Sequence, residues 1–257
     1  MGSTIIDAHA HCGRQDSFPP QDLEDYLGYA RGTGIRGAVM FAPVMEIYDR
    51  YDPRFSDTQT WKARREEANS YLLHLGGADF EVIPYFFIWN DFAVEQLAPG
   101  HRGIKWHRHA DEPVYDYHNP RCRAAVEEIG RRNMPVVLEE ELHNTIFFID
   151  RLAPGLRVII PHLGLLNGGY EPFVRQNVWE RPNVYADTAL APAGVIADYI
   201  RRYGHSRLMF GSDFPFGDPA SELRKILGLE ISDSQRDDIL GLNLLRLIEH
   251  SNTTATG

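Results

Sequence analysis

The chain has 257 residues, of which 43% are hydrophobic, and its 26 Lys and Arg against 36 Asp and Glu give a formal net charge of −10. This length allows a sizeable core, and α/β barrels of this size are common single domains. The acidic balance argues against nucleic acid or an anionic membrane as the main partner, because both carry negative charge themselves. With two cysteines, no basic or apolar leader and no bilayer-length apolar run, we expect a cytoplasmic protein without a disulfide framework.

Eight short runs of apolar, often β-branched residues predict strands along the chain. In order they are Ile5–Ala8, Gly37–Phe41, Val82–Ile88, Gly103–Trp106, Pro135–Leu138, Arg157–Ile160, Val184–Ala186 and Leu208–Phe210. The stretches between them predict helices, among them Gln21–Arg31, Thr60–Leu75, Pro120–Asn133, Asn144–Leu152, Gly194–Tyr203 and Ser232–His250. Apolar strands that alternate with helices are typical of a parallel sheet buried on both faces, and eight repeats favour a single (β/α)8 TIM-type barrel. We assign residues 1–250 to the barrel and expect the tail 251–257 to be disordered.

The first predicted strand ends in two histidines. His9 and His11 lie two positions apart, so they project from the same face of a strand. Two imidazoles that converge at a strand end suit one metal ion. A pair of hydrogen-bonded histidines explains a lone His-x-His equally well, so the other strand ends have to be considered.

Further polar residues follow the later strands, where a barrel of this kind carries its active site. They are Lys105 and His107 at the fourth strand, Glu139 after the fifth, His162 after the sixth, Asp187 after the seventh and Asp213 after the eighth. Each has an ordinary structural explanation when taken alone, such as a core histidine or a helix N-cap. Together they predict a metal site of mixed nitrogen and oxygen ligands in the barrel mouth.

The chain resembles the metal-dependent hydrolases of the amidohydrolase superfamily over nearly its whole length. It is most similar to the branch that contains aminocarboxymuconate-semialdehyde decarboxylase and pyrone-dicarboxylate lactonase. The resemblance rests on residues 7–11, 103–107, 161–164, 183–188, 210–215 and 239–247. It implies that His9, His11 and Asp213 bind the metal, and that His162 either binds a metal or holds the attacking water.

The chain departs from this family pattern at the fifth strand, where Glu139 stands in place of the usual histidine. A glutamate there can still bind a metal, or bridge two, so we expect one or two divalent ions. A carboxylate favours harder ions such as Mn²⁺ or Fe²⁺, and Zn²⁺ remains an option. His107 is a further candidate ligand, for a second ion held with Glu139 and His162.

The activity expected from these residues is hydrolysis of a small molecule, in which a metal-activated water attacks the carbonyl of an ester, lactone, thioester or amide. Asp213 is the candidate general base and acid, and His162 the candidate for orienting the water or polarising the carbonyl. Arg108 and Arg54 are candidates for binding a substrate carboxylate, and Trp89 for lining the pocket. Solvated loop cations and core packing explain these last three as well, and a homodimer is expected only by analogy.

Two alternatives remain at this point. The first is a metal-dependent non-oxidative decarboxylase, because the resembled branch contains both chemistries on nearly one ligand set. The second is a catalytically inactive barrel used as a binding protein, with Glu139 as the remnant of a lost ligand. An inactive barrel would contain little metal and would not change its melting temperature when a chelator is added.

Overall fold

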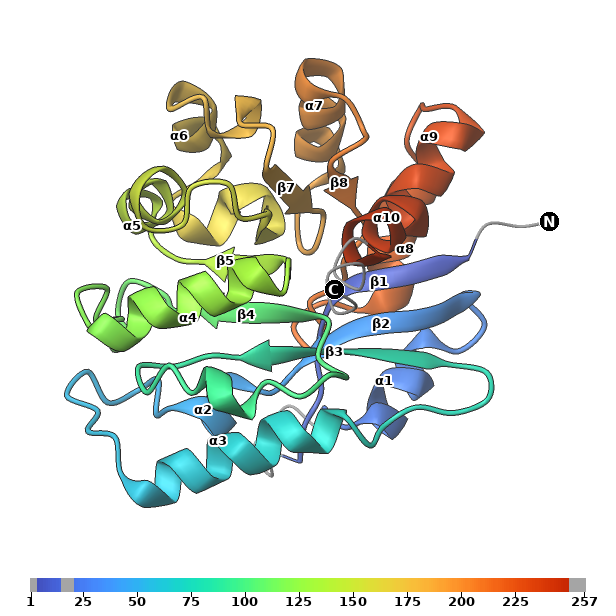
Figure 1. Ribbon diagram of the computed structural model, residues 1–257. Helices are drawn as coiled ribbons and strands as arrows, with labels where there is room; N and C mark the ends of the chain where they lie inside the picture. Colours follow the sequence, from blue (N-terminus) through green and yellow to red (C-terminus); the bar gives the residue numbers. More distant parts are fainter. Residues whose placement is uncertain (1–3, 15–20, 250–257) are drawn as a thin grey trace.

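Eight parallel strands form one sheet whose order follows the chain from β1 to β8. The computed structural model describes residues 4–14 and 21–249 (Figure 1). The strands are β1 Ile5–His11, β2 Ile35–Phe41, β3 Glu81–Phe87, β4 Gly103–His107, β5 Val136–Glu139, β6 Val158–Ile160, β7 Val184–Asp187 and β8 Leu208–Met209. Each overlaps a strand expected from the sequence, and helices connect them around the outside. The predicted (β/α)8 TIM-type barrel is confirmed.

The residues after the short strand β8 close the barrel against β1. The Asp213 amide donates to the His9 carbonyl at 2.7 Å, and the His11 amide donates to the Phe214 carbonyl at 2.8 Å. Gly211 permits this approach, because a Cβ atom there would lie 3.0 Å from the Cβ of His9. The segment that carries Asp213 is therefore held beside the strand that carries both early histidines.

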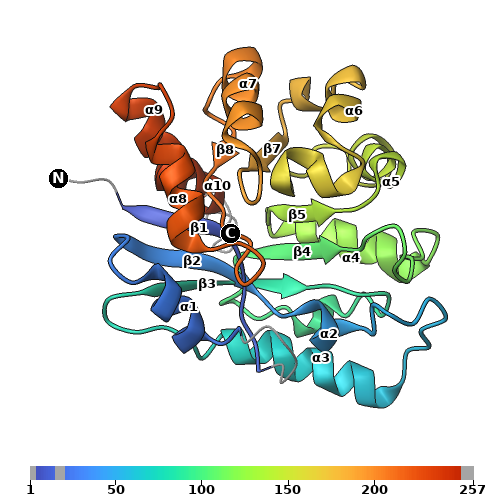
Figure 2. The ribbon, with the colours of Figure 1, turned by 180° about the vertical axis from the view of Figure 1, so that it is seen from behind.

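Helices cover the outer face of the strands in both views of the ribbon (Figures 1 and 2). The α-helices are α1 Leu23–Ala30, α2 Val44–Ile47, α3 Gln59–Leu72, α4 Pro120–Arg131, α5 Leu142–Phe147, α6 Tyr170–Arg175, α7 Ala193–Tyr203, α8 Pro219–Leu227, α9 Asp233–Asp237 and α10 Asn243–Glu249. Short 3₁₀ segments lie at η1 Val94–Gln96, η3 Pro161–Asn167 and η4 Val178–Glu180, and π-helical turns at η2 Phe148–Leu152 and η5 Asp238–Leu242. The last expected helix, Ser232–His250, is thus divided into α9, η5 and α10 over its described part.

The amino-terminal end of the barrel is covered by α10. Leu244, Leu247 and Ile248 pack with the side chains inside the barrel, such as Ile6 of β1. Arg102, which precedes β4, donates to the Ile248 carbonyl at 3.4 Å. The opposite, carboxyl-terminal end is where the polar residues that follow the strands lie, as this architecture requires.

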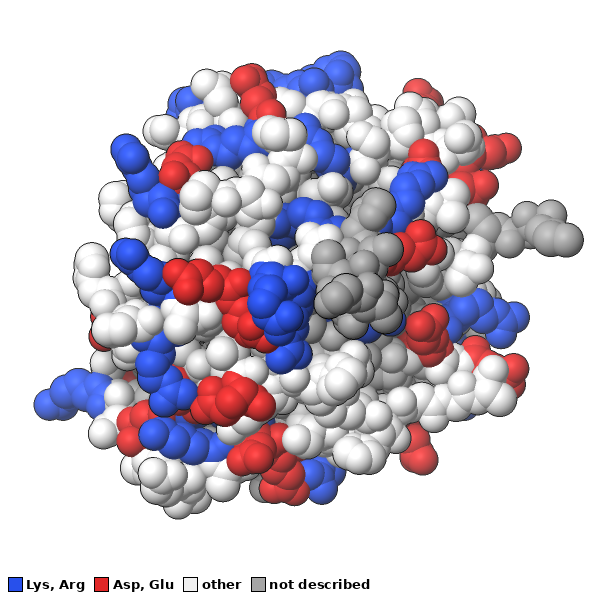
Figure 3. Space-filling view, viewed as in Figure 1, with Lys and Arg blue, Asp and Glu red and all other residues white. Residues whose placement is uncertain are grey.

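The described helices do not include one that is both long enough and apolar enough to cross a membrane. Acidic and basic side chains intermingle over the face shown in Figure 3. The tail 251–257, expected to be disordered, lies outside the described residues. The division into a barrel of residues 1–250 and a tail, like the cytoplasmic location, therefore stays a prediction.

The insertion after β2, residues 42–58, is fixed by a buried arginine of α3. Arg65 donates from both guanidinium ends to Asp57 at 2.7 and 2.9 Å, and from Nε to Asp91 at 3.2 Å. It also donates to the Ile47 carbonyl at 3.0 Å, at the end of α2. One side chain therefore ties the insertion to the loop that follows β3.

Replacing Arg65 by Met should lower the free energy of unfolding by roughly 3 kcal/mol, the low end of the cost of breaking a buried ion pair, because Asp57 keeps some contact with water. Urea denaturation of the wild type and the variant measures this loss. Arg64, exposed on the same helix, provides the control, since Arg64→Met should change stability by less than about 0.5 kcal/mol. Equal losses in the two variants would show that the buried network contributes nothing.

Candidate metal centre

The carboxyl ends of the strands bring the principal predicted ligands into one buried cluster. These residues are His9, His11, Glu139, His162 and Asp213, and none is more than 4% exposed. The Nε2 atoms of His9 and His11 lie 3.3 and 3.4 Å from the same Asp213 oxygen. Possible ligand atoms of His9, Glu139 and His162 likewise lie within 4.8 Å of one another. The structure thus brings together residues from β1, β5, the segment η3 that follows β6, and the segment after β8.

Three imidazoles in this cluster have the same orientation. In each ring Nδ1 faces an acceptor: Asp187 Oδ2 at 2.8 Å for His9, a backbone carbonyl at 3.4 Å for His11, and the Ala189 carbonyl at 3.0 Å for His162. A proton on Nδ1 leaves a lone pair on Nε2, and every Nε2 is directed towards the carboxylates of the cluster. The Nε2 of His9 also lies 3.3 Å from Lys105 Nζ. Metal-binding histidines are held in this way by a partner behind the ring.

Asp187, at the end of β7, orients residues from two other strands. Its Oδ2 contacts the His9 ring, and its Oδ1 accepts from the backbone amides of His162 at 3.0 Å and Ala189 at 3.1 Å. Asp187 was noticed in the sequence as a strand-end acid, but no role was assigned to it. The structure gives it the position of a group that holds two candidate ligand histidines, His9 and His162, in place.

His162 and Asp213 both have left-handed backbone conformations, with φ of 55° and 57°. Such a conformation costs a non-glycine residue about 1–3 kcal/mol and persists only where the surroundings enforce it. For Asp213 the enforcing contact is the hydrogen bond from its backbone amide to the His9 carbonyl. For His162 it is the hydrogen bond from its backbone amide to the Asp187 carboxylate. The fold therefore tolerates strain at two positions from which side chains enter the cluster.

The electrostatics of the cluster favour a bound cation. Burial raises the pKa of Asp213, but neighbouring His162, His11 and His9 lower it more, so its pKa lies below its usual range. Burial lowers the pKa of His162, yet the carboxylates of Asp213 and Glu139 raise it to about 9. Burial also opposes ionisation of Glu139, and nearby positive groups still hold its pKa well below the ordinary value. Both acids are thus ionised, and their buried negative charge favours binding of a cation.

The residues present fit a divalent metal ion. The Nε2 atom of His162 is buried and has no hydrogen-bond partner among the described residues. An unpaired buried nitrogen costs free energy unless something outside the protein satisfies it. Imidazole nitrogen and carboxylate oxygen together form a ligand set that zinc, iron and manganese accept.

A third group of possible ligands lies beside this cluster. His107 Nε2 is 3.5 Å from Glu139 Oε1, and His109 Nε2 is 2.8 Å from the same atom. Behind the rings, Tyr48 lies 3.2 Å from His107 Nδ1 and Arg50 lies 3.2 Å from His109 Nδ1. His109 was not among the predicted ligands, although it repeats the two-residue spacing of the first histidine pair.

A cavity of about 240 Å³ opens onto the cluster. Its lining residues are His11, Val44, Arg50, His107, His109, Glu139, Leu166, Leu190, Asp213 and Phe216. Three residues expected to bind substrate lie elsewhere: Arg54 is exposed, Arg108 is buried against Glu140 and Glu141, and Trp89 stacks on Tyr48 with ring centroids 4.0 Å apart. Their role in binding stays a prediction, and Arg50 is the lining arginine that the sequence did not single out.

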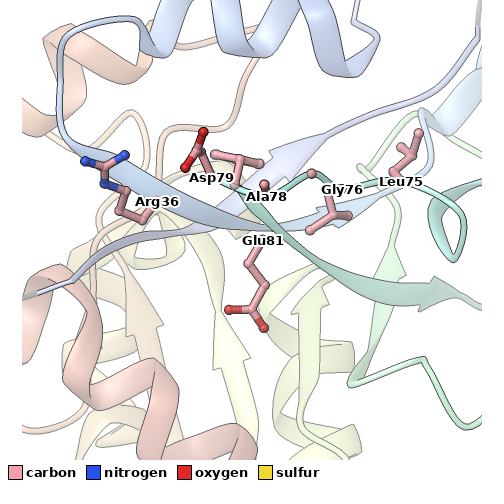
Figure 4. Close-up of a pocket in the computed structure, with 9 residues that line it drawn as sticks. Arg36, Leu75, Gly76, Ala78, Asp79 and Glu81 are labelled. Carbon is pink, nitrogen blue, oxygen red and sulfur yellow. The ribbon is translucent and has the colours of Figure 1, made fainter.

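A hollow of about 570 Å³ lies at the start of β2 and β3, near the amino-terminal end of the barrel (Figure 4). Its charged lining residues are Arg36, Asp79 and Glu81, and Glu81 points away from the other two. Its described lining includes glycines and alanine but no histidine. The smaller cavity at the opposite end therefore remains the candidate site, because it contains the converging ligands.

The sequence profile of the amidohydrolase family matches residues 6–248. The chain belongs to the amidohydrolase family. This confirms the family expected from the strand-end residues, which come from both ends of the matched region. No curated protein matches the chain.

Solved structures of similar fold include both decarboxylases and hydrolases. A 5-carboxyvanillate decarboxylase from Sphingomonas paucimobilis has a TM-score of 0.72 at 11% identity, covering 96% of this chain and 99% of its own. A protein from Pseudomonas putida, provisionally described as a 2-pyrone-4,6-dicarboxylic acid hydrolase, has a TM-score of 0.65 at 19% identity. The match covers 97% of this chain and 98% of that protein. A dihydroxybenzoic acid decarboxylase from Polaromonas sp. JS666, with bound manganese and 2-nitroresorcinol, has a TM-score of 0.71 at 16% identity. The match covers 96% of this chain and 97% of that protein. At these identities the similarity establishes the fold.

Removing divalent metal with a chelator should lower the melting temperature, because an ion that binds only the folded state stabilises it, by about 2.7 kcal/mol at a free concentration of 100 times Kd. Differential scanning calorimetry with and without chelator measures the shift. His9→Ala should abolish most of this response, whereas His118→Ala, an exposed histidine outside the cluster, should retain it. A wild type that contains little metal and melts identically under both conditions would favour the inactive barrel.

Proposed function

We propose that this amidohydrolase-family protein is a metal-dependent hydrolase acting on the carbonyl of a small, carboxylate-bearing ester, lactone, thioester or amide. The observation that carries the proposal is the convergence of two imidazole nitrogens on an ionised Asp213, at the wall of a small cavity. Family membership supports a metal-dependent enzyme, and the intact ligand cluster argues against the inactive barrel.

The proposed cofactor is one or two divalent ions, with zinc, iron and manganese as candidates. His9, His11 and Asp213 would hold an ion, while Glu139 and His162 offer further ligands, with His107 beyond them. A divalent ion supplies Lewis-acid polarisation of a carbonyl and lowers the pKa of water. A mixed set of histidines and carboxylates suits all three metals, and manganese is bound in one decarboxylase of similar fold.

Asp213 is proposed as the group that moves protons. As an ionised carboxylate it can take a proton from the attacking water and later give it to the leaving group, a role worth about 10²–10⁴-fold in rate. His162, whose Nε2 has no hydrogen-bond partner among the described residues, would orient the water or the substrate oxygen. A base that starts ionised suits hydrolysis, in which the first proton transfer is away from water.

Non-oxidative decarboxylation is the second candidate, because two of the three solved structures named above are decarboxylases of aromatic acids. In that reaction a proton has to be delivered to the carbon that loses CO₂. A protonated imidazole would serve this step, and the pKa of about 9 for His162 is in keeping with such a donor. The two reactions differ in product, and the assay below separates them.

We expect lactones, esters, thioesters or amides that bear a carboxylate to be hydrolysed, with release of acid and no CO₂. A panel of these compounds and of aromatic acids, followed by pH-stat titration and by CO₂ detection, tests this. CO₂ release from an aromatic acid without hydrolysis of any panel member would establish the decarboxylase instead.

In the same assay Asp213→Asn should reduce kcat by about 10²–10⁴-fold, since the amide cannot accept the proton. Metal content and circular dichroism serve as controls, because the amide oxygen can still bind an ion and the backbone contacts are unchanged. Retained turnover in a metal-loaded variant would refute the role in proton transfer.

Arg50 is proposed to bind the substrate carboxylate. It lines the cavity, pairs with the buried Glu112 and contacts His109, so its guanidinium is held near the ligand cluster. A guanidinium offers two parallel donors to a carboxylate. The apolar part of the lining, including Leu166 and Phe216, would accept the remainder of a compact substrate.

Arg50→Gln should raise KM for a carboxylate-bearing substrate roughly 10- to 100-fold, the range expected for losing a hydrogen bond to a charged group. A neutral analogue of the same substrate should show little change in steady-state kinetics. Arg54→Gln is the matched comparison, because Arg54 is exposed and outside the cavity lining. A rise in KM for Arg54→Gln and none for Arg50→Gln would transfer the role to Arg54.

A further inference from the structure

We propose that the ammonium group of Lys105 is a resident cation of the centre, which takes the place of a second metal ion and limits the site to one divalent ion at His9, His11 and Asp213. This inference rests on the proposed metal-dependent function. It assigns a role to a side chain that the proposed reaction does not use.

Lys105 places its charge in the middle of the cluster. It projects from β4, its side chain is completely buried, and its Nζ donates to Glu139 Oε2 at 2.7 Å. The same Nζ lies 3.3 Å from His9 Nε2 and 4.3 Å from the centre of the Phe41 ring. An ammonium group needs such partners when it is removed from water, and here a carboxylate and an aromatic face supply them.

The candidate ligand groups share members, which restricts how many ions they can hold together. His9 belongs both to the group with His11 and Asp213 and to the group with Glu139 and His162. Its Nε2 has one lone pair and can bind one ion at a time. An ion at His11 and Asp213 uses that lone pair, so the second group is left incomplete. The third group, His107, His109 and Glu139, does not contain His9, but like the second it depends on Glu139.

Glu139 is the remaining carboxylate, and Lys105 already engages it. One Glu139 oxygen accepts from Lys105, and the other faces His109 at 2.8 Å and His162 at 3.5 Å. An ion bound there would have to share Glu139 with an ammonium group 2.7 Å from the carboxylate. Two like charges that close, in a site with little water, repel each other strongly. The ion proposed at His9 therefore replaces the longer, 3.3 Å contact between Lys105 and His9 Nε2, and Lys105 keeps its 2.7 Å bond to Glu139.

Metal counting tests the proposal directly. Protein saturated with Mn²⁺ or Zn²⁺ and then freed of weakly bound ions should contain one equivalent per chain by inductively coupled plasma mass spectrometry. Lys105→Met keeps a flexible apolar stem against Phe41 and removes the charge, so Glu139 should then recruit a second ion. The count should rise from one equivalent to two, and the second equivalent should raise the melting temperature of this variant.

The matched control is the double variant with Lys105→Met and Glu139→Gln. It loses both charges of the pair, so its metal content should return to one equivalent. Ions bound loosely to the acidic surface would instead give the same metal content in the single and the double variant. Lys105→Gln, which keeps a donor towards Glu139 without the charge, should also bind two equivalents and replaces Lys105→Met if that variant does not fold.

Two equivalents in the wild type would overturn the role of Lys105 and leave the proposed hydrolase unaffected. One equivalent in a folded Lys105→Met or Lys105→Gln variant would also overturn it. A wild type that binds no metal under any condition would instead refute the proposed function, and with it this inference.

Discussion

Negative charge buried at the mouth of the barrel is the constraint on which the site depends. Asp187, Glu139 and Asp213 are all nearly inaccessible to water. Carboxylates in such surroundings persist only when cations or donors compensate them. The barrel supplies part of this compensation from His9 and Lys105, and a bound ion would supply the rest.

The fold meets this constraint by bringing backbone and side chains together across the ring. Asp187 of β7 accepts from two amides and one imidazole, so it connects β1 and the segment η3 after β6 through a single carboxylate. Gly211 lets the chain after β8 approach β1, and this places Asp213 beside the early histidines. Strained backbone at His162 is maintained by the same contacts. The strained backbone thus lowers local stability, and it fixes the positions of a few polar atoms.

The sequence predicted the eight strands well, because buried parallel strands have a simple apolar signature. It also predicted the convergence of His9, His162 and Asp213, since residues that follow strands of one barrel meet at one end. It did not assign Asp187 a role, because that role consists of contacts with amides distant in sequence. Arg50 lies in an irregular insertion, where no periodic pattern indicates which side chain faces the cavity.

Helix boundaries were less predictable for similar reasons. Helix α8 was not among the expected helices, although Asp218 and Pro219 provide an ordinary N-cap and first-turn proline. The last predicted helix is interrupted by the π-turn η5, where Gly241 passes so close to Thr4 that a Cβ atom would lie 2.3 Å from its carbonyl oxygen. A contact between the two ends of the chain leaves no signal in either segment alone.

The closure of the ring by the chain after β8 has a consequence for assembly of the protein. The candidate ligands His9, His11 and Asp213 come from the first strand and from the segment after the last, so a half-barrel lacking either end would lack part of this ligand set. Capture of an ion during refolding would then report the moment at which the two ends meet. A spectroscopically visible metal such as Co²⁺ would act as a clock for that final event, separate from the earlier appearance of helices.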